Sequence, residues 1–468
     1  MGTSAEFASY CESLTYSDIP PETLDNAKKV LLDTLGIAVG GARAASTTTV
    51  TNVIDDLDPA TEPGSEAGAT ILSNGNRASP DYAAMINGML AHSLDYDETH
   101  REGSVHAAAP ILGAALPVGE TVGAAGRDLL SAFVAGYEVT ARLGMALNSE
   151  VHYGMGFHAT STCGVFGATA AIGWLRGFDA EEFQTAFGVN GSQSSGSLQF
   201  LENGAWNKRL HPGLAAHSAW IATTFANHGF VAASDPIEGH RGFLQTYSRD
   251  PLPDRATAGL GDGFEIDRTG LKPYPLCRFV HPAVDGLLEM VETHDVAPED
   301  VTSVRVGMSS AGYGIVGEPE GAYPQSIVDA QFSMPFAAML AITRREATVD
   351  ALFDAVEGAF TDEEKRLLDA TTTESADWAD AKYPEQWAVE VTIETNGESF
   401  ETVVEDARGD PENPLSWNEV SSKFDELVVP VVGQDTADRF RERIEDVEAY
   451  TVRDLLEPLR DASFSDPN

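Results

Sequence analysis

The sequence has 468 residues, of which 43% are hydrophobic and 8% aromatic, and its 73 Asp and Glu residues against 29 Lys and Arg residues give a formal net charge of −44. This length exceeds the usual size of a single hydrophobic core and predicts two domains, and the composition is that of a folded globular chain. The negative charge excludes nucleic acids and anionic membranes as general partners, because both would be repelled.

The acidic residues are dispersed along the chain rather than gathered in one block. A block of like charge is typical of an acidic tail that binds basic proteins. A dispersed excess is typical of a surface adapted to concentrated salt, because the Debye length falls to about 3 Å at 1 M and self-repulsion is screened. We therefore expect a halophilic protein, with a non-catalytic acidic protein that binds basic partners as the alternative.

The N-terminal stretch MGTSAEFASYCESLTY contains no basic segment followed by an apolar one, and no apolar run in the sequence reaches membrane-spanning length. Three cysteines, Cys11, Cys163 and Cys277, are odd in number and far apart, which does not fit a disulfide framework. The sequence therefore predicts a cytoplasmic protein that does not bind membranes.

The first part of the chain, residues 1–266, is predicted to be helical. Apolar residues recur at helical spacing in residues 21–42, 127–147 and 158–177, and the intervening residues are largely Ala and Gly. Small side chains allow helices to approach one another closely. We expect these residues to form a large all-α domain.

After residue 266 the pattern includes strands. Residues 301–308 alternate between apolar and polar, and residues 387–404 have the pattern of a hairpin with Asn396-Gly397 at its turn. Helical patterns at 335–347 and 348–360 lie between them, so residues 267–405 are expected to form a smaller α+β domain. After a linker-like stretch at 407–420, a helical pattern at 436–459 indicates that residues 406–468 complete the first domain, and the fold class is mainly α.

Ten of the eleven histidines lie between His92 and His281, which indicates a site in that part of the chain. Residues 91–110, AHSLDYDETHREGSVHAAAP, combine imidazoles with carboxylates. Asp95 and Thr99 share one face if this segment is helical. Together with His100 and His106 they can supply an acid/base group and the partners that orient it.

Two other chemistries fit the same segment less well. Asp95, Asp97, His100 and His106 are competent metal ligands, but their spacing matches neither the paired-His helix nor the calcium loop, and we expect no metal. LDYDET also contains the D-x-D-x-T pattern of metal-dependent phosphohydrolases, with Asp95 as the nucleophile. That chemistry requires the end of a buried parallel strand, whereas the preceding residues 81–94 have a helical pattern.

The chain has only seven lysines, and two of them lie in aromatic, proline-containing stretches with little charge. Lys208 lies in WNKRLHPGLAAHS and Lys272 lies in KPYPLCRFVHPAVDG. An ammonium group in such surroundings can bind a substrate carboxylate or take part in proton transfer. In GFHATSTCGVFGA, His158 is predicted to begin a helix, and a helix N-terminus favours an anion.

Four segments, HSLDYDETH, GFHATSTCGVFGA, WNKRLHPGLAAHS and KPYPLCRFVHPAVDG, resemble in this order the MmgE/PrpD family, which includes 2-methylcitrate dehydratases, cis-aconitate decarboxylases and iminodisuccinate epimerases. The resemblance implies a large all-α helical domain with a smaller inserted α+β lid domain, a pocket between the two and a homodimer without a cofactor. It carries the family's site roles onto Asp95, Thr99, His106, His158, Lys208 and Lys272.

Two positions depart from the family pattern. Cys277 stands where a histidine is expected in the decarboxylases, which weakens that activity. Phe336 stands where relatives commonly have tyrosine, which removes a possible hydroxyl donor from the pocket.

The resulting hypothesis is a hydro-lyase that dehydrates 2-methylcitrate, as in propionate catabolism, or a related small tricarboxylate. The alternatives within the family are a cis-aconitate-type decarboxylase and an iminodisuccinate-type epimerase. Elimination of water needs a base, an acid and cations that hold the substrate carboxylates. The predicted roles are proton transfer by His106 and His158, with the base undecided, orientation by Asp95 and Thr99, and carboxylate binding by Lys208 and Lys272 with help from Arg209 and Arg278.

Overall fold

The computed structural model describes residues 2–58 and 68–465, and most of them are helical. The predicted mainly α fold with a small sheet in the C-terminal part is confirmed. The chain divides into two compact units, which are described separately. The first comprises Met1–Leu201, Trp206–Thr269 and Ser416–Asn468, and the second comprises Glu202–Ala205 and Gly270–Leu415.

Helices form almost all of the first unit, and the predicted helices at 21–42, 127–147 and 158–177 correspond to α2, α6 and α8. Short strands are β1 (Ala69–Thr70), β2 (Arg77–Ala78) and β3 (Thr99–His100), and β4 (Thr269–Gly270) begins at Thr269, the last residue of the second segment of this unit. The helices are α1 (Thr3–Ser13), α2 (Pro21–Gly40), α3 (Ala45–Leu57), α4 (Pro80–Leu90), α5 (Ala108–Val122), α6 (Gly126–Ala146), α7 (Ser149–Gly154), α8 (Ala159–Arg176), α9 (Ala180–Asn190), α10 (Asn207–Asn227), α11 (Phe243–Tyr247), α12 (Asp254–Thr257), α20 (Trp417–Val432), α21 (Gln434–Glu445), α22 (Val452–Leu455) and α23 (Glu457–Arg460).

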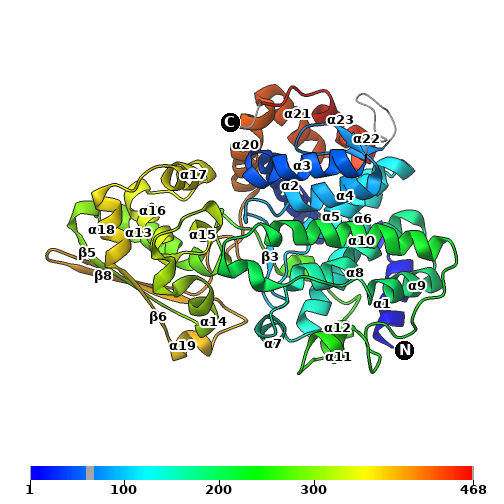
Figure 1. Cartoon of the computed structure of the whole chain (residues 1–468), viewed down its shortest axis with the longest axis horizontal. Coiled ribbons are helices and arrows are strands. Elements are labelled where there is room, and N and C mark those ends of the chain that lie inside the picture. Colours follow the sequence, from blue (N-terminus) through cyan, green and yellow to red (C-terminus); the bar gives the residue numbers. More distant parts are fainter. Residues whose placement is uncertain (1, 59–67, 466–468) are drawn as a thin grey trace. The chain divides into compact units, whose positions relative to one another are not determined.

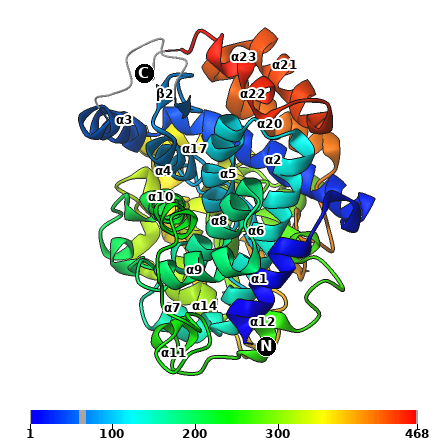
Figure 2. The same cartoon turned by 90° about the vertical axis from the view of Figure 1, so that its right-hand side faces the viewer.

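Three buried helices, α5, α6 and α8, run through the middle of the first unit, with α4 and α10 packed against them (Figures 1 and 2). Small residues make this close packing possible, as the Ala- and Gly-rich sequence predicts. A Cβ added to Gly136 would lie 2.7 Å from the carbonyl oxygen of Gly167, and one added to Gly113 would lie 2.6 Å from the Cα of Gly88. Backbones at these crossings therefore approach closely enough to hold the helix ends near one another.

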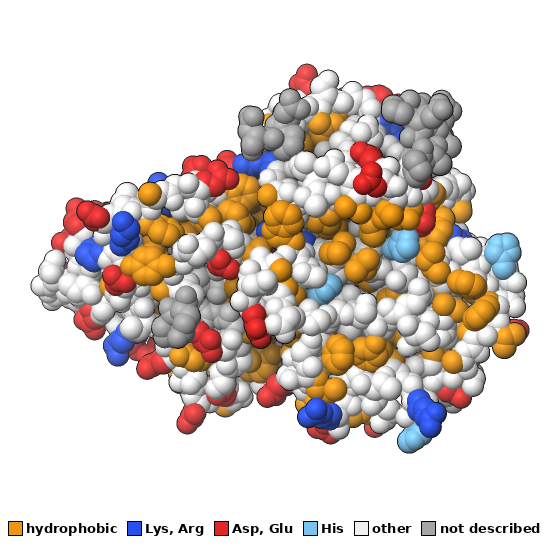
Figure 3. Space-filling model, viewed as in Figure 1, with side chains coloured by type: hydrophobic (Ala, Val, Ile, Leu, Met, Phe, Trp, Pro, Cys, Tyr) orange, Lys and Arg blue, Asp and Glu red, His pale blue; other side chains and the backbone are white. Residues whose placement is uncertain are grey.

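Helix α10 carries an exposed apolar row on its outer face. Leu214 and Phe225 are 38% and 46% exposed, and Leu210 and Ile221, which share their face at helical spacing, are half-buried. Hydrophobic side chains follow α10 across the face seen in Figure 3, while acidic side chains are scattered over that face rather than gathered. None of the helices among the described residues is long and apolar enough to cross a membrane.

The second unit contains a four-stranded sheet of order β6-β5-β7-β8. Its strands are β5 (Val301–Met308), β6 (Thr371–Ser375), β7 (Val389–Thr395) and β8 (Ser399–Val404), with β5 parallel to β6 and the other neighbours antiparallel. The predicted strand at 301–308 is β5, and the predicted hairpin at 387–404 is β7 and β8, joined through Asn396-Gly397.

Helices α13, α16 and α18 pack against this sheet (Figure 1) and bury one hydrophobic core with it. Phe336, which departs from the family pattern, is fully buried in that core. The helices of this unit are α13 (His281–Thr293), α14 (Ser310–Gly312), α15 (Ile327–Gln331), α16 (Met334–Arg344), α17 (Val349–Glu357), α18 (Asp362–Ala370) and α19 (Asp377–Asp380).

Candidate active site

The ends of four packed helices position the site residues of the first unit. The loop between α4 and α5 carries Asp95, Thr99 and His106, His158 is the N-cap residue of α8 as predicted, and Lys208 lies in the first turn of α10. The sequence predicts that Asp95 and Thr99 share one face only if their segment is helical, and this segment between α4 and α5 is not helical. Asp95 has a φ of 52°, a left-handed conformation that Asp tolerates better than most residues, and Thr99 lies in β3.

Asp95 and Lys208 form a buried ion pair. The Lys208 ammonium bonds the Oδ1 atom of Asp95, and the two side chains are only 13% and 4% exposed. The next residue, Arg209, is also buried and donates from Nη1 to Ser46 Oγ at 3.2 Å. Burial lowers the pKa of Arg209 to about 10, and the charge of Asp95 opposes that shift. Two cationic groups and one carboxylate therefore lie together.

Four imidazoles form a continuous cluster beside this pair. The ring centroid of His92 lies 5.0 Å from that of His106 and 5.7 Å from that of His158, and the centroids of His158 and His211 are 5.2 Å apart. The Nδ1 atoms of His158 and His211 are hydrogen-bonded at 3.0 Å. The structure thus brings His106 and His158 together through His92 and adds His211.

Sequence reasoning did not select His92 or His211, although both lie within the quoted segments. His211 follows Lys208 by three residues on α10, so helical spacing alone places the two on neighbouring faces. His92 precedes Asp95 by three residues in the α4–α5 loop, where no regular spacing applies. Helical spacing could therefore have indicated that His211 lies near Lys208, whereas the position of His92 depends on the conformation of the loop.

Two of the four imidazoles are held neutral by their surroundings. Burial, followed by the charges of His92 and Lys208, lowers the pKa of His211 to about 4. Burial also lowers the pKa of His158 well below its usual range, and the neighbouring His211, His92, Lys208 and His106 act in the same direction. At pH 7 His158 is therefore an uncharged imidazole that can accept a proton.

His106 is oriented by the backbone of its own loop. Its Nδ1 lies 2.6 Å from the carbonyl oxygen of Glu98, which can only accept, so Nδ1 carries the hydrogen in the neutral ring and Nε2 is the nitrogen that gains or loses a proton. The side chain is 12% exposed. The adjacent Thr99 Oγ1 is buried and has no hydrogen-bond partner among residues 2–58 and 68–465, so it can serve a ligand.

One set of side chains, His92, Asp97 and His106, has donor atoms within 4.8 Å of one another and could be considered for a metal. The arrangement is that of a hydrogen-bonded set. His92 Nδ1 lies 2.5 Å from Asp97 Oδ2, too short for two ligands of one cation without rearrangement, and His106 Nδ1 already bonds Glu98. His100, from the set considered in the sequence, instead bonds Glu265 at 3.1 Å and supports the loop.

The surroundings of Asp95 also differ from those of a phosphohydrolase nucleophile. Helix α4 precedes it, and its carboxylate is paired with Lys208. A nucleophilic aspartate of that class projects from the end of a parallel strand.

The remaining predicted site residues lie in the second unit. Lys272 is 1% exposed, and Arg278 is 3% exposed and paired with Asp410. The backbone N–H of the neighbouring Leu271 donates to the carbonyl oxygen of Gly409 at 2.8 Å. Residues 270–278 are thus fixed against the 407–413 loop, and the predicted roles of Lys272 and Arg278 toward a substrate stay predictions.

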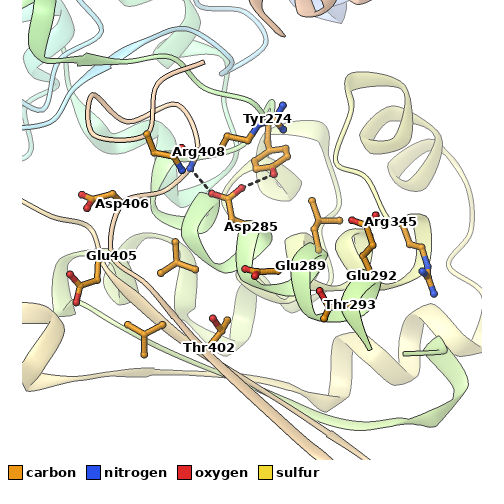
Figure 4. Close-up of a pocket in the computed structure, with 14 residues that line it drawn as sticks. Tyr274, Asp285, Glu289, Glu292, Thr293, Arg345, Thr402, Glu405, Asp406 and Arg408 are labelled. Carbon is orange, nitrogen blue, oxygen red and sulfur yellow. Dashed lines mark hydrogen bonds between the residues drawn. The ribbon is translucent and has the colours of Figure 1, made fainter. Parts of the chain in front are cut away.

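A separate pocket of about 830 Å³ lies within the second unit (Figure 4). Asp285 is hydrogen-bonded there to the Tyr274 hydroxyl at 2.7 Å and to the backbone N–H of Arg408 at 2.7 Å. The lining contains five acidic residues and two arginines, so it is unsuited to a polycarboxylate. The acidic residues are Asp285, Glu289, Glu292, Glu405 and Asp406.

The chain is a mainly α protein in which the ends of packed helices bring four imidazoles close to a Lys–Asp ion pair. Comparison with known families identifies the family. Residues 5–256 match the MmgE/PrpD N-terminal domain, and residues 274–449 match the MmgE/PrpD C-terminal domain. The chain belongs to the MmgE/PrpD family, and the resemblance predicted from its four segments is confirmed.

Similar curated proteins are named as cis-aconitate decarboxylases or as a cis-aconitate decarboxylase-like protein. The cis-aconitate decarboxylase of Aspergillus terreus is 26% identical over 298 residues, which are 61% of this chain and 59% of that protein. The cis-aconitate decarboxylase-like protein oryM of Aspergillus oryzae is 23% identical over 97% of this chain and 96% of its own length. The human cis-aconitate decarboxylase is 27% identical over 54% of this chain and 52% of its own length. The matches to the Aspergillus terreus and human proteins therefore span little more than half of each.

Proposed function

We propose that this chain is a cofactor-free hydro-lyase that dehydrates 2-methylcitrate or a related small tricarboxylate. The observation that carries the proposal is the cluster of His92, His106, His158 and His211 beside the Asp95–Lys208 pair. Dehydration needs one group to remove a carbon-bound proton and another to protonate the leaving hydroxyl, and a cluster of imidazoles in different surroundings supplies both.

In this proposal His158 is the base and His106 the acid. His158 is neutral because burial lowers its pKa, so it is ready to accept the proton from carbon. His106 keeps its Nδ1 hydrogen on Glu98 and, when protonated, donates from Nε2 to the hydroxyl. Lys208 binds the carboxylate next to the reacting carbon, and its charge stabilises the negative charge that develops there.

The other predicted residues complete the proposal. Arg209, next to Lys208 and buried, adds positive charge, and Thr99 and Asp95 orient the substrate and the ammonium. Lys272 and Arg278 are proposed as further carboxylate ligands on the basis of the family resemblance. Arg278 is paired with Asp410, and this pair would position its guanidinium in the proposed role.

Decarboxylation of cis-aconitate is the second candidate, supported by the names of the similar proteins. It requires a proton donor at the carbon that loses CO₂, a role that His106 can also fill. Cys277, where a decarboxylase is expected to have histidine, counts against it. Epimerisation of iminodisuccinate, in which a proton is removed from and returned to one carbon, uses the same two imidazoles.

The test is to purify the protein in high salt with EDTA and offer 2-methylcitrate, citrate, cis-aconitate and iminodisuccinate, with chromatography of the products. We expect an alkene and water from 2-methylcitrate, abolished in the His158→Ala and Lys208→Ala variants and retained in His228→Ala, an exposed matched control. CO₂ from cis-aconitate would favour the second candidate.

Three other outcomes would redirect the assignment. Loss of activity on chelation would indicate a metal enzyme. Release of phosphate from phosphomonoesters, dependent on Asp95, would indicate the hydrolase. Capture of basic proteins without turnover of any acid would indicate the binding protein.

We further propose a homodimer in a salt-rich cytoplasm. Leu210, Leu214, Ile221 and Phe225 form an apolar row on α10 in a protein of net charge −44 (Figure 3). An exposed apolar row on so charged a protein supports an interface with a second subunit. The dispersed acidic side chains support adaptation to salt, because screening removes the repulsion between two such subunits.

A further inference from the structure

A buried histidine that the proposed mechanism does not use, His92, lies at the centre of the imidazole cluster. Its side chain and that of Asp97 are both fully buried, and Nδ1 is 2.5 Å from Asp97 Oδ2. The other ring nitrogen, Nε2, is buried and has no hydrogen-bond partner within the described part of the chain. A buried polar atom without a partner costs free energy, so its retention indicates a use.

The position of His92 relates the two proton-transfer residues to each other. It is the ring next to both, 5.0 Å from His106 and 5.7 Å from His158 between ring centroids. Asp97 Oδ2 also lies 3.7 Å from His106 Nδ1, so one carboxylate serves two imidazoles. A buried carboxylate beside an imidazole stabilises its protonated form.

Dehydration leaves His158 protonated and His106 neutral, the reverse of the protonation states with which the reaction begins. The C–H bond breaks, its electron pair forms the C=C bond and the proton goes to His158. The C–O bond breaks with its electron pair on oxygen, which takes a proton from His106 and leaves as water. After one turnover His158 is charged and His106 neutral, and His158 is 2% exposed, so bulk water does not reach it readily.

We propose that His92, held by Asp97, returns the proton from His158 to His106 and so resets the site. Nε2 of His92 takes the proton from His158, Asp97 stabilises the imidazolium that results, and His92 passes the proton to Nε2 of His106. No proton is gained or lost in the sequence. The titratable groups that face this path are Asp97, His106, His158, His211 and Lys208. This inference rests on the proposed function only for the direction of the transfer.

Pre-steady-state kinetics test the relay, because His92 acts after chemistry. In the His92→Gln variant, the first turnover should proceed at the wild-type rate and later turnovers about 10²-fold more slowly. The time course should therefore show a burst of one product per active site, and kcat and KM should fall together so that kcat/KM is unchanged. In the wild type the time course should be linear.

His100→Gln is the matched control, because His100 is an equally buried imidazole of the same loop, paired with the carboxylate of Glu265 outside the cluster. It should show no burst. If His92→Gln does not fold, Asp97→Asn replaces it, since the amide keeps the shape of the carboxylate and removes its charge. Equal slowing of the first and later turnovers, or a burst in His100→Gln, overturns the relay.

A readout without substrate separates failure of the relay from failure of the proposed function. NMR of ¹³C-labelled histidines should show that His92→Gln moves the His106 midpoint, because Asp97 Oδ2 lies 2.5 Å from His92 Nδ1 and 3.7 Å from His106 Nδ1. If the wild type turns over none of the four acids, the proposed function fails and this titration decides the relay. An unmoved His106 midpoint overturns it.

Discussion

Acidification from pH 7 to pH 5 should destabilise the first unit through the buried imidazole of His152. Its Nδ1–H donates to the carbonyl oxygen of Tyr247 at 2.7 Å, and its Nε2 accepts from the Thr162 hydroxyl at 2.9 Å. Both nitrogens are satisfied in the neutral form. Burial lowers the pKa of His152 to about 4, and the bond to Tyr247 opposes that shift only in part.

The size of the effect follows from the difference between the folded and unfolded states. An unfolded histidine titrates near pH 6.5, and the pKa of folded His152 is about 4, so the unfolded state binds more protons between these values. The stability contributed by the neutral imidazole is present above pH 6.5 and is lost as pH falls toward 4. Between pH 7 and pH 5 the loss is about 2 kcal/mol, at roughly 1.4 kcal/mol per pH unit below 6.5.

Urea unfolding at pH 7 and pH 5 in constant high salt measures this loss. In His152→Gln the group is absent, so the difference between the two unfolding free energies should be about 2 kcal/mol smaller than in the wild type, even though the variant is less stable at both pH values. His228→Gln, at an exposed position, controls for the introduced glutamine. An equal pH difference in wild type and His152→Gln would show that protonation of this imidazole does not limit stability.

Three further outcomes are expected. Asp95→Asn should lower kcat/KM at least about 10-fold with the fold retained by circular dichroism, because the partner of Lys208 loses its charge, and an unchanged kcat/KM would count against the ion pair as part of the site. Calorimetry should show that a tricarboxylate binds more tightly as salt is added. Salt screens the repulsion from a chain of net charge −44 more than the short-range attraction to the cations of the site. Weaker binding at high salt would contradict this. Leu214→Glu with Phe225→Glu should yield monomers in sedimentation experiments, while Val231→Glu, at a 91% exposed apolar position off the helix, should not.

Much of the fold could be predicted because periodicity reports local structure directly. The helices α2, α6 and α8 and the strand β5 follow their apolar patterns almost to the residue. In the C-terminal part the pattern is less direct. The linker-like stretch at 407–420 contains the start of α20, and the Ser416–Glu419 capping box is the local signal that marks this helix start. The continuous pattern at 436–459 is interrupted before α22, where Thr451 caps a new helix.

The candidate site shows where sequence reasoning stops. His158 stands out by motif and Lys208 by the scarcity of lysine, and the first lies in the imidazole cluster and the second in the ion pair beside it. The burial of His92 against Asp97 depends on a loop without periodicity, so the sequence contains both residues without indicating that they meet. Conversely, His100 has the residue type of a catalytic group but is used to bond Glu265.

A third lysine is buried although its sequence surroundings are charged. Lys423 is 5% exposed and binds Asp33 at 2.6 Å and the carbonyl oxygen of Tyr96 at 2.8 Å. Its ammonium also lies 3.8 Å from the centre of the Tyr96 ring. Tyr96 stands between Asp95 and Asp97, so this lysine of α20 fixes the backbone that carries both carboxylates. The C-terminal segment thus completes the first unit and holds the loop on which the proposed chemistry depends, because Lys423, like Lys208, neutralises a buried carboxylate.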